Sequence, residues 1–199
     1  KNLAAFVAEE VNFSTIGPAL GVELKKIAVQ AVLLVLLGII LYISYAFRKI
    51  ARAPVPAWAF GLGAIIALIH DITIVVGVFV VLGKFFNIQI DSFFVTALLT
   101  ILGFSVHDTI VVYDRIREGL KHQEKKSFVE IMNRSINTTL IRSLNTSLTT
   151  LIVLSALNLL GGEGIRLFVL ALLIGIVVGT YSSIFIASPF LLLIQRFRR

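Results

Sequence analysis

Five long apolar segments constrain this chain more than any other feature of its sequence. They cover about residues 24–47, 57–83, 90–116, 136–160 and 165–194, and each is long enough to cross a bilayer as a helix. A soluble core of 199 residues has no need of five such segments, and 58% hydrophobic residues agree with a membrane protein. We therefore expect an all-α, polytopic membrane helix bundle with five transmembrane helices.

Basic residues orient the expected bundle. If the segments alternate in direction, the first-to-second loop, the third-to-fourth loop and the C-terminus share one side, which carries twelve Lys and Arg against five on the other. Because cytoplasmic loops are enriched in basic residues, we expect the C-terminus in the cytoplasm and the N-terminus outside. The net charge of +7 then reflects orientation and anionic headgroups, not nucleic-acid binding. Residues 1–23 are expected to be the tail of a missing extracytoplasmic domain, and residues 24–199 the transmembrane domain.

Two opposite charges lie inside segments that should be in lipid. Asp108 lies seven residues before Arg115, roughly 10 Å inward from the cytoplasmic end of the third segment. Arg142 lies eight residues after Arg134, roughly 12 Å inward from the same side in the fourth segment. Charges at this depth are costly and mark function by default. Since the two segments are antiparallel neighbours, an ion pair between Asp108 and Arg142 is geometrically available.

The fourth segment carries a broad polar face. One stripe at helical spacing contains Thr138, Arg142, Asn145 and Thr149, and a second contains Ser135, Thr139, Ser143, Thr146 and Thr150. Small hydroxyl residues alone favour close helix packing with hydrogen bonds across the interface. A guanidinium has five donors to satisfy, so Arg142 favours a polar network with room for water.

A short repeat places His-Asp in the middle of the second and third segments. The sequences are ALIHDITIVVGV at 67–78 and FSVHDTIVVYD at 104–114. Adjacent helical residues diverge by about 100°, so at most one of His70 and Asp71, or of His107 and Asp108, faces a common site. The histidines fit packing and function equally well, whereas a buried carboxylate such as Asp71 favours a role in the polar network.

The same His-Asp pairs do not favour a metal phosphohydrolase, because the chain has one further histidine, His122, and no cysteine. We expect no metal and no cofactor.

Gly175 and Gly179 form a small-xxx-small pattern that suits close helix packing. Residues 127–135 fit either a short interfacial helix, with Phe128, Ile131 and Met132 facing lipid, or a plain helical linker.

Four blocks of the chain resemble the SecF family of protein-export membrane subunits. They are FSTIGPALGVELKK, GFSVHDTIVVYDRIRE, NRSINTTLIRSLNTSLTTL and GTYSSIFIASP, and the resemblance runs from about residue 13 to residue 193. The family is similar in architecture to the resistance-nodulation-division transporters, with six spans and a large extracytoplasmic domain between the first two. This resemblance implies that the five segments are the last five spans of such a six-span half.

The resemblance also implies a function and partners. The chain is expected to be a non-enzymatic, multi-pass subunit of the cytoplasmic (inner) membrane that works with SecD and the SecYEG channel. It would couple the proton motive force to preprotein export, and the preprotein would contact the absent domain. Asp108 and Arg142 match the family's functional charges, and Asp108 would alternate between an ionised, paired form and a protonated, released form.

Two other classes share the charge pattern. The chain could be half of a proton-coupled exporter of small molecules or lipids, which requires a substrate cavity between halves. It could also be a passive assembly subunit whose charge pair fixes helix register.

Overall fold

The computed structural model describes residues 18–48, 55–122 and 127–197, and within these residues it is all helical. The elements are α1 (Pro18–Ala46), α2 (Ala57–Phe86), α3 (Ser92–His122), α4 (Phe128–Leu160), α5 (Glu163–Ser182), the π-helical segment η1 (Ser183–Ala187) and α6 (Ser188–Phe197). Five helical stretches are long and apolar enough to cross a membrane, with α5, η1 and α6 forming the last one. The expected helix bundle with five spans is confirmed.

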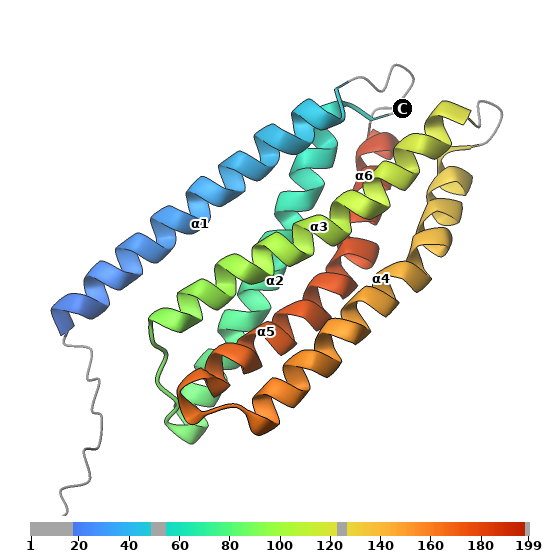
Figure 1. Ribbon diagram of the computed structural model, residues 1–199. Helices are drawn as coiled ribbons and strands as arrows, with labels where there is room; N and C mark the ends of the chain where they lie inside the picture. Colours follow the sequence, from blue (N-terminus) through green and yellow to red (C-terminus); the bar gives the residue numbers. More distant parts are fainter. Residues whose placement is uncertain (1–17, 49–54, 123–126, 198–199) are drawn as a thin grey trace, which may run out of the picture.

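The helices form one elongated bundle with α3 and α5 at its centre. α1 and α4 lie on opposite edges, and α2 packs against α1, α3 and α5 (Figure 1). The ends of the helices follow local signals. Asn87 ends α2 in a left-handed conformation at φ 53°, and Asp91 Oδ1 accepts a hydrogen bond from Phe94 N at 3.2 Å at the start of α3.

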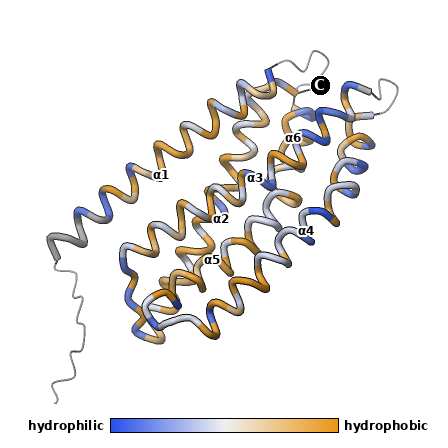
Figure 2. Tube along the Cα trace, in the orientation of Figure 1, coloured by the Kyte–Doolittle hydropathy of each residue, from blue (hydrophilic) through white to orange (hydrophobic). Residues whose placement is uncertain are grey.

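The outer surface of the bundle is apolar, as a lipid-facing surface requires. Hydrophobic residues run along the helices, and hydrophilic residues gather toward helix ends, with a further polar stretch within α4 (Figure 2). Leu34, Phe86 and Leu160 are 73%, 71% and 88% exposed. In water such a surface would be unfavourable, so the bundle suits a multi-pass membrane protein.

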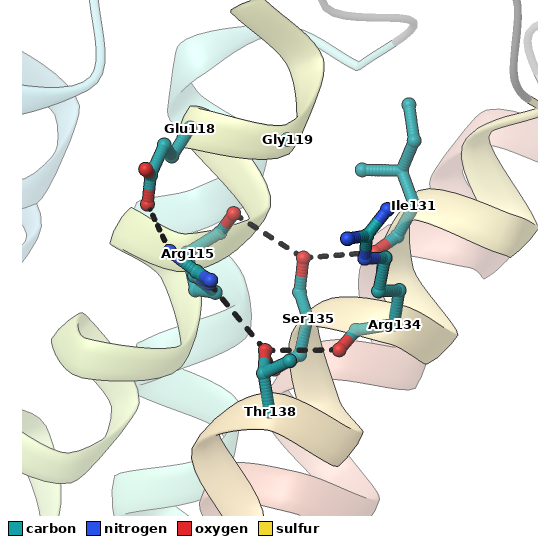
Figure 3. A pocket seen from close by; sticks show the side chains of 7 residues that line it. All are labelled: Arg115, Glu118, Gly119, Ile131, Arg134, Ser135 and Thr138. Carbon is teal, nitrogen blue, oxygen red and sulfur yellow. Dashed lines mark hydrogen bonds and ion pairs between the residues drawn. The ribbon is translucent and has the colours of Figure 1, made fainter. Parts of the chain in front are cut away.

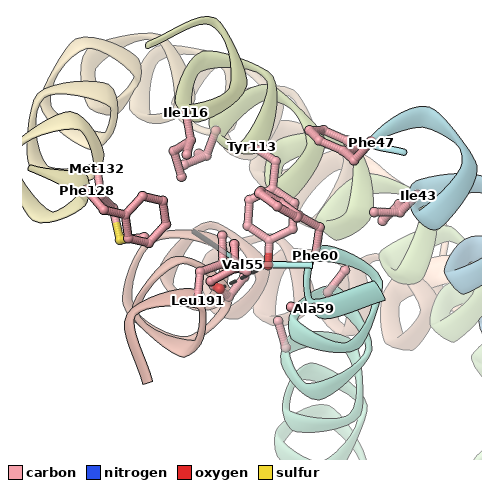
Figure 4. Packing of buried hydrophobic residues seen from close by; sticks show 14 residues of the cluster. Ile43, Phe47, Val55, Ala59, Phe60, Tyr113, Ile116, Phe128, Met132 and Leu191 are labelled. Atoms are coloured by element: carbon pink, nitrogen blue, oxygen red, sulfur yellow. Dashed lines mark hydrogen bonds between the residues drawn. The ribbon is translucent and has the colours of Figure 1, made fainter. Parts of the chain in front are cut away.

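One hydrophobic cluster joins α1, α2, α3, α4 and α6 near one end of the bundle (Figure 4). Phe47 stacks on Phe60 with ring centroids 5.0 Å apart, and Tyr113 packs edge-on against both rings. The Tyr113 hydroxyl donates to the Ala187 carbonyl at 2.9 Å. This hydrogen bond is one of the contacts that join the π-helical segment η1 to α3.

Of the two alternatives for residues 127–135, the short interfacial helix is wrong. α4 runs without a break from Phe128, and Ser127 caps it: Ser127 Oγ accepts from Glu130 N at 3.2 Å while Glu130 Oε2 accepts from Ser127 N at 3.0 Å. Phe128, Ile131 and Met132 are buried and do not face lipid. Their i, i+3, i+4 spacing forms one face, and that face meets α3 and α6.

The remaining predicted boundaries fall close to the helix ends, with differences in the first, third and last spans. α3 continues to His122, beyond the expected end near residue 116, and the last span contains the π-helical segment that periodicity did not indicate. Of the expected extracytoplasmic tail, residues 1–17 lie outside the described residues, whereas α1 already begins at Pro18. The side of the membrane that each end faces stays a prediction.

Candidate functional site

Asp108 is buried where three elements meet. It lies on α3, is 6% exposed, and both carboxyl oxygens accept hydrogen bonds from serines. Ser143 Oγ of α4 donates to Oδ1 at 2.6 Å, and Ser183 Oγ of η1 donates to Oδ2 at 2.5 Å. The carboxyl is therefore satisfied by neutral hydroxyl groups that are able both to donate and to accept.

Asp71 on α2 occupies a second site of the same construction. It is fully buried, and its Oδ2 accepts from Ser105 Oγ of α3 at 2.6 Å and from Ser182 Oγ of α5 at 2.8 Å. Its Oδ1 lies 3.1 Å from His70 Nδ1, where the imidazole tautomer decides the hydrogen bond. The repeated His-Asp motif thus supplies two buried carboxyls, each held by one serine of the next helix and one serine of the last span.

The close approach of α5 to α3 makes the Asp71 site possible. A Cβ at Gly179 would lie 3.0 Å from Ser105 Cβ, and a Cβ at Gly175 would overlap the side chain of Ile101. Since glycine alone leaves this space open, Gly175 and Gly179 allow the two backbones to approach. Ser105 and Ser182 then reach the same carboxyl oxygen of Asp71.

The structure does not join Asp108 to Arg142. No ion pair connects them among the residues that the structure describes, and the Arg142 side chain is exposed on α4. Consecutive helical residues diverge by about 100°, so the inward direction of Ser143 turns Arg142 away. The ion pair expected from equal depth is therefore absent in this arrangement, and Arg142 faces outward from the bundle.

The other residues of α4 that were predicted to belong to the network all lie on its exposed face. Thr138, Asn145 and Thr149 are exposed on the same side as Arg142, whereas Ser143 and Ser147 point inward. Thr149 Oγ1 donates to the carbonyl of Thr146 at 2.9 Å, within its own helix. His107 is exposed, so of the His-Asp pairs only the carboxyls are fully inside the bundle.

A polar hollow lies between α3 and α4 near the end of α3 (Figure 3). Arg115 donates to Glu118 at 2.5 Å and to Thr138 Oγ1 at 3.4 Å. Ser135 Oγ donates to the carbonyl of Arg115 at 3.2 Å, which ties α4 to α3. These hydrogen bonds hold α3 and α4 in register. The hollow lies toward the same end of the bundle as the Tyr113 cluster.

Sequence reasoning missed the consecutive serines Ser182 and Ser183. Ser105 was also not identified, and Ser143 was noticed only as part of a polar stripe. Two adjacent serines inside an apolar segment could have indicated a polar site, because each buried hydroxyl needs a hydrogen-bond partner. Which carboxyl each serine reaches depends on the placement of α5 and η1 against two other helices.

Comparison with known proteins agrees with this architecture. The family model described as "Protein export membrane protein SecD/SecF, C-terminal" matches residues 1–197. The protein translocase subunit SecF of Thermobaculum terrenum is 53% identical over 180 residues, which cover 90% of this chain and 56% of that protein. The protein translocase subunit SecDF of Thermus thermophilus is 47% identical over 174 residues, or 87% of this chain and 22% of that protein.

A solved structure has the same fold. The crystal structure of SecDF in a super-membrane-facing form superposes with a TM-score of 0.77 at 42% sequence identity, covering 92% of this chain and 23% of that one. The chain thus spans little more than half the length of the SecF relative from Thermobaculum terrenum, at 56%. On the match over residues 1–197 and the identities of these relatives, the chain belongs to the SecD/SecF C-terminal family of protein-export membrane proteins.

Proposed function

We propose that this chain is the membrane region of an auxiliary subunit of the Sec protein translocase, which couples the proton motive force to preprotein export. The names of its relatives, protein translocase subunits SecF and SecDF, support the setting. The single observation that carries the coupling is the buried Asp108 carboxyl, held by Ser143 and Ser183 and by no cation among the described residues.

This hydrogen-bonding arrangement suits a carboxyl that gains and loses a proton. A serine hydroxyl donates to an ionised carboxylate, and it accepts from the neutral acid once its own proton has another acceptor. Ser183 has such an acceptor, because its Oγ also lies 3.0 Å from the carbonyl of Thr180. Both protonation states of Asp108 are therefore satisfied without a stranded polar group, whereas a guanidinium partner would favour the ionised state alone.

Arg142 takes a different part in this proposal. Its charge stands on the exposed face of α4 with Thr138 and Asn145, at a depth where lipid contact is costly. We infer that this face meets a polar partner or a water path, and SecD, to which one relative is fused, is the partner that we propose. The SecYEG channel would be the site at which the assembled complex acts.

The energy available from one proton is adequate for switching a helix packing. A charge crossing a membrane gains about 2.3 kcal/mol per 100 mV, which corresponds to about a fiftyfold change in a two-state equilibrium. Protonation of Asp108 changes its bonds to α4 and η1 together. The relative packing of α3, α4 and η1 is therefore the element through which proton binding would be transmitted.

The test is proton-driven export by the full-length protein in its complex, measured in inverted membrane vesicles. Asp108→Asn keeps the size and hydrogen bonding of the side chain but removes the titratable group. We expect an assembled complex with ATP-driven export intact and the proton-driven component lost.

Asp114→Asn is the matched control, because Asp114 is an exposed carboxylate on the same helix and is expected to be dispensable. Full proton-driven export by the Asp108 variant would refute the proposal. Proton flux that depends on Asp108 without any effect on protein export would favour an exporter of small molecules or lipids.

A further inference from the structure

The two buried carboxyls are connected through consecutive residues of the last span. Ser182 donates to Asp71, and its neighbour Ser183 donates to Asp108. We propose that Asp71 is a second proton-binding site and that the Ser182–Ser183 pair couples it to Asp108. The coupling rests on the proposed function of Asp108 as a proton carrier.

Asp71 has the surroundings of a carboxyl that exchanges a proton. It is fully buried, and no Lys or Arg bonds to it within the residues that the structure describes. The groups that face it are His70 of its own helix and the hydroxyls of Ser105 from α3 and Ser182 from α5. An ionised carboxyl without a cation is costly in such an interior, so proton binding offers the alternative state.

His70 lies at the outer edge of this site. Its side chain is 28% exposed while Asp71 is fully buried, and its Nδ1 lies 3.1 Å from Asp71 Oδ1. The ring also lies beside Tyr181, with centroids 6.3 Å apart. The imidazole carries a titratable nitrogen in direct contact with the buried carboxyl, so it supplies a route for the proton of Asp71.

Both serines of the pair have an alternative acceptor within their own helix. Ser182 Oγ lies 3.1 Å from the Gly179 carbonyl, and Ser183 Oγ lies 3.0 Å from the Thr180 carbonyl. Each hydroxyl has one proton, so it bonds either to the carboxylate or fully to the carbonyl. When a carboxyl becomes protonated, it donates to the serine oxygen, and the serine hydroxyl donates to the backbone carbonyl of its own helix.

The helix geometry at the pair connects the two changes. α5 ends at Ser182, and the π-helical segment begins at Ser183, so both serines sit at the transition between two helical geometries. Ser188 Oγ donates to the Ser183 carbonyl at 3.0 Å, which fixes the first turn of this segment. Because the two serines share a peptide unit, a shift of one backbone position alters the distance from the other serine to its carboxyl. π-helical turns of this kind occur frequently at functional sites.

The experiment is infrared titration of carboxylic-acid bands in the assembled, full-length complex, reconstituted in lipid with isotope-labelled aspartate. We expect two buried bands that titrate, one lost in Asp71→Asn and the other in Asp108→Asn. Ser105→Ala, which touches Asp71 and not Asp108, assigns the Asp71 band if Asp71→Asn is not recovered as an intact complex.

A matched pair of serine variants tests the coupling. Ser183→Ala and Ser143→Ala each remove one donor from Asp108, but only Ser183 adjoins Ser182. We expect Ser183→Ala to change the proton affinity of Asp71 about tenfold, less than a lost hydrogen bond to a charged group would change that of Asp108 itself, because the effect reaches Asp71 only through Ser182. Ser143→Ala should leave the proton affinity of Asp71 unchanged.

Three results would overturn the inference. If Asp108 titrates and Asp71 does not, the second site is absent while the proposed function stands. If the two serine variants shift Asp71 equally, the coupling acts through space and the serine pair has no special part. If Asp108 itself does not titrate, the proposed function fails, and coupling to it fails as well.

Discussion

Replacement of Gly179 by leucine tests whether the close approach of α5 to α3 determines the stability of the bundle. A Cβ at this position would lie 3.0 Å from Ser105 Cβ and 3.3 Å from Ser105 Oγ, whereas carbon atoms in favourable contact are about 3.5–4.0 Å apart. Leucine adds three further carbons beyond the Cβ. The two helices must separate, and Ser105 must move away from Asp71, to which it donates at 2.6 Å.

The expected cost follows from three contributions. Overpacking of a filled interior costs about 1–3 kcal/mol. Loss of a hydrogen bond to a charged group costs about 1.5–3 kcal/mol. Replacement of a mid-helix glycine by a better helix former stabilises the helix by about 1 kcal/mol. The free energy of unfolding should therefore fall by about 1.5–5 kcal/mol in Gly179→Leu. Gly179→Ala introduces the Cβ alone, so its free energy of unfolding should lie between those of Gly179→Leu and the wild type.

The assay is thermal unfolding of the purified full-length complex, together with the yield of intact complex. Gly103→Leu is the matched control, because Gly103 is an exposed glycine on α3 and a Cβ added there would meet no atom within 4 Å. We expect the control to stay within about 1 kcal/mol of the wild type, and the Gly179 variant to melt several degrees lower. Equal melting temperatures for the two leucine variants would show that the approach of α5 to α3 is not tight.

Three further predictions concern the orientation, the two charges Asp108 and Arg142, and the π-helical segment. Lys121→Cys should resist an impermeant thiol reagent added outside intact cells; labelling from outside would reverse the orientation expected from the basic loops. The double variant Asp108→Asn with Arg142→Gln should assemble but stay inactive in proton-driven export, and an active double variant would refute the proposed role of Asp108 as a proton carrier. Tyr113→Phe should lower the free energy of unfolding by about 1–3 kcal/mol, because the buried Ala187 carbonyl loses its donor; an unchanged melting temperature would count against this fastening contact.

The sequence by itself determined the fold class and singled out the two carboxyls that lie inside the bundle. Five apolar segments of bilayer length require helices, since a backbone in lipid must satisfy its own hydrogen bonds. The same reasoning singles out Asp71 and Asp108, because a carboxyl within an apolar helix is rare and needs partners. These conclusions depend on local composition and length, which are readable along the chain.

The partners of those carboxyls were decided only by the tertiary structure. Depth along the helix placed Asp108 and Arg142 at one level, but depth says nothing of the direction in which a side chain points around its helix. The rotation of α4 turned Ser143 inward and Arg142 outward, and it also buried Phe128 and Met132, which one of the two alternatives for residues 127–135 placed against lipid. Likewise, the serines of the last span serve two different carboxyls because α5 and η1 pack against α2 and α3 together. Such rotations follow from the simultaneous packing of several helices, and no single segment carries that information.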